Sequence, residues 1–488
     1  MLFNSLEFFL FLPIVFVLYW FVFTRGIKLQ NLFILICSYF FYGWWDWRFL
    51  SLILLSTVVD YFVGLNIHNS QDNKVKKTYL WVSILFNLGL LGFFKYFNFF
   101  IDSWIDLLHG FGYEQKSVWT LNVILPVGIS FYTFQTMSYS LDIYYKKLKP
   151  TKDFISFASF VSFFPQLVAG PIERAKNLLP QFQIKRVFNY NKAVDGCRQI
   201  LWGLFKKIVI ADNCALYVNE IFTNYNDYAG STLLLGTILF SFQIYGDFSG
   251  YSDIAIGTAR LLGFDLIQNF AFPYFSRDVA EFWRRWHISL SSWFRDYLYI
   301  PLGGSRCENW RKVRNIFIIF MVSGFWHGAN WTFILWGAIH AVYLVPLILQ
   351  DKNRINLGPV AQRRYLPSIK EAFKIITTFF LTSIAWVFFR ANSISHAISY
   401  LKSLFSKSLF SLSLQDIDKI SYGYHIVILL IILILFILVE WAQRTKKHAL
   451  EFDSVNFPLL LRWSLYYSLL YIIFQFGASQ QHFIYFQF

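Results

Sequence analysis

The sequence predicts an all-α, polytopic membrane protein with about 11–13 transmembrane helices, together with re-entrant and interfacial helices. Three observations support this class. Hydrophobic residues make up 56% of the 488 residues and charged residues only 15%, which is too little charge to cover several soluble domains. Apolar runs recur along the whole chain. The first run lacks a basic n-region and a small-residue cleavage site, so we expect a retained span and not a signal peptide.

The expected spans follow the apolar runs. A helix needs roughly 17–25 residues to cross a hydrocarbon core of ~30 Å. Runs that approach this length, several of them short or interrupted, lie at 6–23, 29–46, 49–66, 79–97, 121–143, 198–222, 231–258, 315–328, 331–350, 371–389, 424–441 and 461–477. No soluble domain stands between them, so we expect a single membrane domain over residues 1–488.

One apolar stretch, 154–172, is broken by Pro165, Gly170 and Pro171. Interrupted helix at membrane depth is tolerated only where protein or a water-filled cavity surrounds it. We therefore expect a re-entrant segment here.

The charge pattern predicts the orientation of the chain. The formal net charge is +15, but the basic residues gather in short loops between apolar runs, which favours membrane orientation over nucleic-acid binding. By the positive-inside rule these loops face the cytoplasm and the N-terminus lies outside. The basic clusters are at 25–28, 74–77, 146–152, 284–314, 352–364 and 444–447.

Residues 279–298 have the period of an amphipathic helix. Apolar residues recur there at steps of three and four, with Arg284, Arg285 and Arg295 beside the apolar face. We expect this helix to lie at the cytoplasmic interface. Five arginines could grip the phosphates of a cytosolic donor, although orientation by charge explains each of them more simply: Arg284, Arg285, Arg306, Arg311 and Arg314.

Several classes of chemistry are disfavoured by missing motifs. The chain contains no Walker A, HExxH, GxSxG or GxGxxG pattern. Its four cysteines, Cys37, Cys197, Cys214 and Cys307, are far apart, so neither a metal site nor a disulfide framework is expected.

His327 is the first candidate for catalysis. It lies in VSGFWHGANW, with apolar residues on both sides and small residues that allow a neighbouring backbone to approach. A polar group at that depth is costly and is by default a functional candidate. Burial keeps an imidazole neutral and basic, which suits a general base that takes a hydroxyl proton. The alternative is a core histidine bonded to a backbone carbonyl.

His287 is the second candidate, within FWRRWHISLS, on the predicted helical face of Trp283, Leu290 and Phe294. A lone histidine on an amphipathic helix is as often structural as functional. The two histidines are far apart in the sequence, but they could meet across a fold.

Five ordered motifs resemble those of the membrane-bound O-acyltransferase (MBOAT) family, and most closely its alginate O-acetyltransferase branch. They are LPVGISFYTFQ (125–135), FFPQLVAGPI (163–172), GDFSGYSD (246–253), FWRRWHISLS with YIPLGG (282–291, 299–304), and WHG (326–328). The closing FIYFQF (483–488) extends the resemblance over essentially the whole chain.

The resemblance implies an all-helical enclosure with a tunnel, in a multi-pass protein of the bacterial plasma (inner) membrane. His327 would be the catalytic residue and His287 would lie on the donor side. With no bound cofactor, the protein would move an acetyl group from a cytosolic donor, acetyl-CoA or another acyl thioester, to a hydroxyl reached from outside. An extracytoplasmic acetyltransferase partner would complete O-acetylation of a secreted or cell-surface polysaccharide, a step of exopolysaccharide biosynthesis.

Two alternatives remain open. Within the family, D-alanyl transfer from a carrier protein to teichoic acid would use the same histidine. A multi-span transporter or flippase would also place polar residues in apolar spans, but internal repeats are expected there and each motif occurs once.

Overall fold

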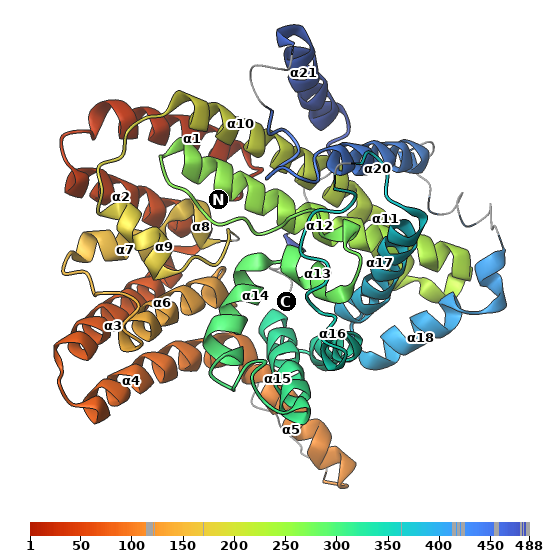
Figure 1. The fold of residues 1–488 in the computed structure, drawn as a ribbon, viewed down its shortest axis with the longest axis horizontal. Helices are drawn as coiled ribbons and strands as arrows, with labels where there is room; N and C mark the ends of the chain where they lie inside the picture. The colour runs from red at the N-terminus through yellow and green to blue at the C-terminus, as the bar shows by residue number, and fades with distance from the viewer. Residues whose placement is uncertain are drawn as a thin grey trace. The chain divides into compact units, whose positions relative to one another are not determined.

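The computed structural model describes residues 1–488 except 114–120, 122, 169, 363, 412–415, 417–419, 421–424, 453–457, 479–480, 482 and 485–488. Within the described residues every regular element is helical, as predicted (Figure 1). They form two compact units, one of residues 1–193 with 258–267 and the other of residues 194–257 with 268–488. A single membrane domain therefore stays a prediction, and each unit is described by itself.

The first unit is built around a buried helix, α6. Helix α3 packs against both α4 and α6, and α2 packs against α7 (Figure 1). The helices of this unit are α1 (Leu6–Val17) with η1 (Leu18–Val22), α2 (Ile27–Asp46), η2 (Trp47–Phe49), α3 (Leu50–Asn69), α4 (Asn73–Leu91), η3 (Gly92–Tyr96), α5 (Phe97–Gly110), α6 (Ile129–Tyr144), α7 (Phe154–Ser162), α8 (Phe164–Leu167) and α9 (Ala175–Phe182).

The predicted break in the stretch 154–172 is confirmed. The chain leaves helical geometry at Phe163, between α7 and the short α8, and residues 170–174 are not helical. Pro165 lies in the first turn of α8, where its missing N–H has no intrahelical acceptor to lose. Whether this segment is re-entrant stays a prediction.

The second unit contains most of α12, which is the longest helix among the described residues, and the hairpin of α15 and α16. Helices α10 and α12 cross the boundary between the units. The elements are α10 (Tyr190–Leu204), η4 (Phe205–Ala211), α11 (Asp212–Thr223), η5 (Tyr225–Asp227), α12 (Gly230–Leu261), η6 (Pro273–Phe275), α13 (Val279–Arg285), α14 (Ile288–Phe294), η7 (Arg295–Tyr299), α15 (Asn309–His327), α16 (Trp331–Leu349), α17 (Ile369–Arg390), α18 (Ile394–Leu404), η8 (Lys407–Phe410), α20 (His425–Ala442) and α21 (Leu459–Gln475).

Five helical stretches among the described residues are long and apolar enough to cross a membrane. They are Ile27–Asn69, Asn73–Gly110, Trp331–Leu349, Ile369–Arg390 and His425–Ala442. These stretches identify a multi-pass membrane protein. The predicted total of about 11–13 spans stays a prediction, because other predicted runs fold into helices that are shorter or more polar.

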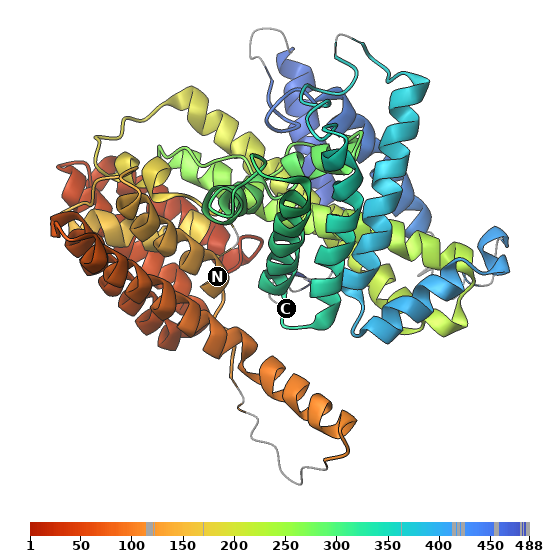
Figure 2. The ribbon, with the colours of Figure 1, turned by 60° about the horizontal axis from the view of Figure 1, so that its bottom comes forward.

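Glycines let α15 and α16 approach each other closely, as expected from the small residues around His327. A Cβ added at Gly324 would collide with the carbonyl oxygen of Phe333, and one at Gly337 with the carbonyl oxygen of Phe320. Figure 2 shows the two helices side by side, in teal. This contact fixes the end of α15, where His327 lies.

Candidate active site

The amphipathic stretch 279–298 is not one helix, and that prediction was wrong. Helix α13 ends at Arg285, Trp286 is extended, and His287 adopts the left-handed conformation with φ 43° before α14 begins. The cause is tertiary: Asn269 accepts a hydrogen bond from the N–H of Ile288 through its carbonyl oxygen. The side-chain period continues through the break, so the sequence pattern could not reveal it.

The break turns His287 into the interior of the second unit. Its side chain is buried, and its Nδ1 lies 3.1 Å from Oδ1 of Asn269. The ring of Phe248 stands perpendicular to the imidazole at 4.6 Å between centroids. His287 lies outside the five candidate spanning stretches, and burial lowers its pKa to about 3, so the imidazole is neutral.

His327 is the last residue of α15 and is 3% exposed. Aromatic rings surround it: the centroids of Trp326, Trp336 and Phe389 lie 5.0, 5.2 and 5.4 Å from its own. The helix does not continue through Gly328. Asn330 instead caps α16 by accepting a hydrogen bond from the N–H of Thr332, so Asn330 does not share a helical face with His327.

The structure brings the two predicted histidines together. Their ring centroids are 6.3 Å apart, although one precedes α14 and the other ends α15. At this separation one hydroxyl or one water between the rings could hydrogen-bond to both.

A mostly apolar cavity of about 210 Å³ is lined by residues of the helices that adjoin this pair, although neither histidine lines it. Ser323 lines it one helical turn before His327, and Ser291 lines it one turn after His287. Arg295 and Asn353 add polar groups to the wall. The other lining residues are Trp283, Phe294, Tyr299, Ile316, Ile319, Phe320, Leu344 and Ile348.

A third histidine, His340 of α16, is buried behind the cavity wall. Trp283 donates a hydrogen bond from its indole N–H to Nδ1 of His340 at 3.3 Å, and Trp336 makes edge-on ring contacts with both His340 and His327. His340 therefore supports the aromatic wall, in agreement with a packing role.

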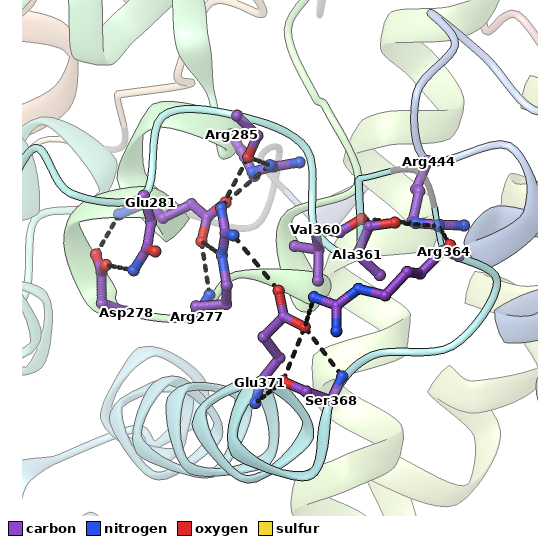
Figure 3. A network of polar contacts seen from close by, with 12 residues as sticks. Arg277, Asp278, Glu281, Arg285, Val360, Ala361, Arg364, Ser368, Glu371 and Arg444 are labelled. Atoms are coloured by element: carbon purple, nitrogen blue, oxygen red, sulfur yellow. Dashed lines mark hydrogen bonds and ion pairs between the residues drawn. The ribbon is translucent and has the colours of Figure 1, made fainter.

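Two of the arginines considered for phosphate binding serve the protein itself. Arg284 donates to the carbonyl oxygens of Asn353 and Asn356, and Arg285 pairs with Glu281 at 2.8 Å. Figure 3 shows Glu281 and the surrounding network, in which Arg444 donates to the backbone carbonyls of Val360, Ala361 and Arg364. The network ties residues of three predicted cytoplasmic clusters together, as expected if all three lie on one side of the membrane.

The acids of the GDFSGYSD motif are ion-paired inside the second unit. Asp247 pairs with Lys207 at 2.8 Å, and Asp253 pairs with Lys206 at 2.6 Å. They lie within α12 and do not cap it. Of the closing FIYFQF, residues 485–488 lie outside the described residues, while Phe483 packs on Tyr251 at 4.3 Å between centroids.

Asn269 belongs to this site and was missed at the sequence level. It is fully buried and bonds to both the side chain and the backbone around His287. It lies between α12 and η6 in a segment with no helical period, so no pattern marked it.

The sequence matches a known family. Residues 77–390 match the model of the membrane-bound O-acyltransferase (MBOAT) family. The chain belongs to this family. It is 40% identical over 415 residues to the "Probable alginate O-acetylase AlgI" of Pseudomonas aeruginosa, covering 85% of this chain and 76% of that protein.

Two further relatives widen the comparison within the family. The chain is 34% identical to the "Peptidoglycan O-acetyltransferase" of Helicobacter pylori, covering 100% of this chain and 98% of that protein. It is 27% identical to the "Teichoic acid D-alanyltransferase" of Streptococcus thermophilus, covering 59% of this chain and 76% of that protein. This MBOAT protein is therefore more similar to the O-acetyl-transferring relatives than to that D-alanyl-transferring one.

Proposed function

We propose that this membrane O-acyltransferase moves an acetyl group from a cytosolic thioester to a hydroxyl, for O-acetylation of a secreted or cell-surface polysaccharide. His327 is the proposed catalytic base. The observation that carries the proposal is the pair of buried imidazoles, 6.3 Å apart, beside a cavity that reaches one helical turn from each of them.

The chemistry needs one proton acceptor at the point of attack. His327 takes the proton of the acceptor hydroxyl as its oxygen attacks the thioester carbonyl, and the carbon–sulfur bond then breaks. The departing thiolate takes the proton from the imidazolium and leaves as a thiol. The histidine is then neutral again, so protons balance over one cycle. General-base assistance of this kind is worth about 10²–10⁴ in rate.

The cavity suits the extended arm of a thioester donor. Its wall is mostly apolar, with Ser291 and Ser323 near the histidines and Arg295 elsewhere on the wall. An apolar slot with a few placed polar groups is typical of small-molecule sites. Because Arg295 belongs to the basic region predicted to face the cytoplasm, we place the donor on that side, with acetyl-CoA or another acyl thioester as the substrate. His287, one turn from the cavity, is then on the donor side.

The names of the relatives support a glycan as the acceptor. One relative is named for alginate and another for peptidoglycan, and both are glycans outside the cytoplasm. We infer a glycan hydroxyl as the final acceptor, an extracytoplasmic acetyltransferase as partner, and the bacterial inner membrane as the location.

In the test, acetyl-CoA labelled in the acetyl group is added to inside-out membrane vesicles that contain the protein. Label in an extracytoplasmic glycan or in a co-purifying partner supports the proposal. His68→Ala is the matched control, because His68 lies exposed at the end of α3. Vesicles that take up a solute but label no hydroxyl would instead favour a transporter. Transfer of D-alanine, and not acetyl, from a carrier protein would favour the teichoic acid alternative.

A further inference from the structure

The amide of Asn269 makes four polar contacts, and three of them reach residues 287–289. Its Oδ1 lies 3.1 Å from Nδ1 of His287, 2.9 Å from the hydroxyl of Ser289 and 3.3 Å from the N–H of Ser289. On the other side, its Nδ2 donates to the hydroxyl of Ser252 at 3.1 Å.

These contacts fix which way the amide faces. A backbone N–H can only donate, so the atom of Asn269 that meets the N–H of Ser289 must be the oxygen. The same oxygen faces Nδ1 of His287, which therefore has to carry a hydrogen. In a neutral imidazole the lone pair is then on Nε2.

The backbone of Asn269 holds the same turn. Its carbonyl oxygen accepts from the N–H of Ile288 at 2.9 Å, directly after the left-handed residue His287. A non-glycine residue in that conformation is strained and persists only where its surroundings impose it. Asn269 supplies that constraint through both its main chain and its side chain.

We propose that Asn269 is a positioning residue for the acyl transfer, holding His287 in the Nδ1–H tautomer so that Nε2 is its proton acceptor. This inference rests on the proposed function. When His327 takes the hydroxyl proton, positive charge develops on its ring, 6.3 Å from that of His287. A neutral imidazole with a lone pair stabilises this charge, whereas the other tautomer would present an N–H and oppose it.

The contacts of His287 include Phe248 of α12, Trp326 and His327 of α15, and Asn269 and Ser289. His327 is a titratable group among these contacts, so a change at Asn269 can act on the pH profile through the two histidines.

The experiment compares Asn269→Leu with Asn269→Asp in the full-length protein, using acetyl-CoA as the donor probe. Leucine has a similar size but accepts no hydrogen bond, so kcat should fall about 10²-fold while KM for the donor stays within twofold. Aspartate keeps the acceptor, so kcat should recover to within about tenfold of the wild-type value. Its charge should also move the acid limb of the kcat profile to higher pH, since a carboxylate stabilises the imidazolium.

A matched control is Asn213→Leu. Asn213 lies in α11 of the same unit and donates to backbone carbonyls, including that of Phe476 at 2.8 Å. Loss of one side-chain amide there should leave kcat within twofold. A folded Asn269→Leu protein with wild-type kcat overturns the inference. If that variant does not fold, the aspartate variant decides, and an unmoved pH profile overturns the inference.

A second readout does not depend on turnover. Nitrogen-15 NMR of histidine-labelled protein, with the spectrum of a His287→Gln variant subtracted, reports which ring nitrogen of His287 is protonated. A hydrogen on Nδ1 supports the inference and one on Nε2 overturns it.

A wild-type protein that transfers no acetyl group would overturn the proposed function. An active wild type with an equally active Asn269→Leu variant would overturn only the role of Asn269.

Discussion

Each unit of this protein buries polar side chains that lie among apolar residues in the sequence, but the neighbours of these side chains differ between the two units. In the first unit, Asp60 of α3 is fully buried within a candidate spanning stretch. Its carboxylate accepts hydrogen bonds from Ser83 and Asn87 of α4 and from Ser140 of α6. In the second unit, His287 and His327 are as deeply buried, but they lie among aromatic rings beside a cavity.

This difference distinguishes a region that serves packing, around Asp60, from a region suited to chemistry, around the two histidines. The Asp60 region is a closed network, because Asn87 in turn accepts from Ser56 and Thr136 through its own amide oxygen. Such a network cross-links three helices and offers no surface to a substrate. The histidine region instead adjoins a space that a substrate can fill. Burial of a polar residue in a membrane protein thus marks a candidate, and the neighbours decide its role.

The largest effect is expected at His327. Replacing His327 with alanine removes the proposed base, and acetyl transfer should fall by about 10²–10⁴. The protein should still fold, because the change is confined to one side chain at the end of α15. Labelled acetyl transfer per folded molecule is the measurement. A variant as active as the His68→Ala control would remove His327 from the mechanism.

A smaller loss is expected for His287→Ala. This change removes the neutral imidazole that supports the charge on His327 but leaves the base itself, so kcat should fall by about 10–100-fold. The donor KM should change little. A wild-type kcat for His287→Ala would show that His287 serves packing, as Asp60 does.

The cavity provides a third comparison. Ser323→Phe should fill space next to the histidine pair, which hinders the donor and raises its KM by about tenfold with a lesser change in kcat. Val322→Phe is the matched control, since Val322 is exposed on the same helix. Equal donor KM values for the two variants would show that the donor does not enter this cavity.

The smallest effect on rate is expected at Asp60. Asp60→Asn keeps the size of the side chain but turns one acceptor into a donor, so the hydrogen bonds of Ser83, Ser140 and Asn87 cannot all be kept. We expect a loss of about 1–3 kcal/mol in the free energy of unfolding and acetyl transfer within twofold. Thermal unfolding and the transfer assay on the same preparation test this. A large loss of kcat with unchanged stability would give Asp60 a place in the chemistry.

The sequence predicted much of the fold because apolar periodicity is local information. The runs at 331–350 and 371–389 fold as α16 and α17 with ends that differ by at most two residues. The break at His287 was not predictable, because it is imposed by Asn269 from another part of the chain. The amphipathic period alone favours one continuous helix there.

The candidate site was predictable only in part. The apolar surroundings of His327 and His287, and the motifs that they lie in, predict both as candidates, and the structure brings their rings together. Asn269 carried no signal, since it lies in an irregular segment. Asp60 did carry one, as an acid within an apolar run, yet only its hydrogen bonds show why it is there.

The most direct test measures single-turnover acetyl transfer and the unfolding midpoint together for purified wild-type, His327→Ala and Asp60→Asn proteins. The account predicts that His327→Ala loses at least about 10²-fold in rate in protein that is still folded, while Asp60→Asn keeps its rate and unfolds at a lower temperature than the wild type. A His327→Ala protein that is folded and transfers acetyl groups at the wild-type rate would contradict it.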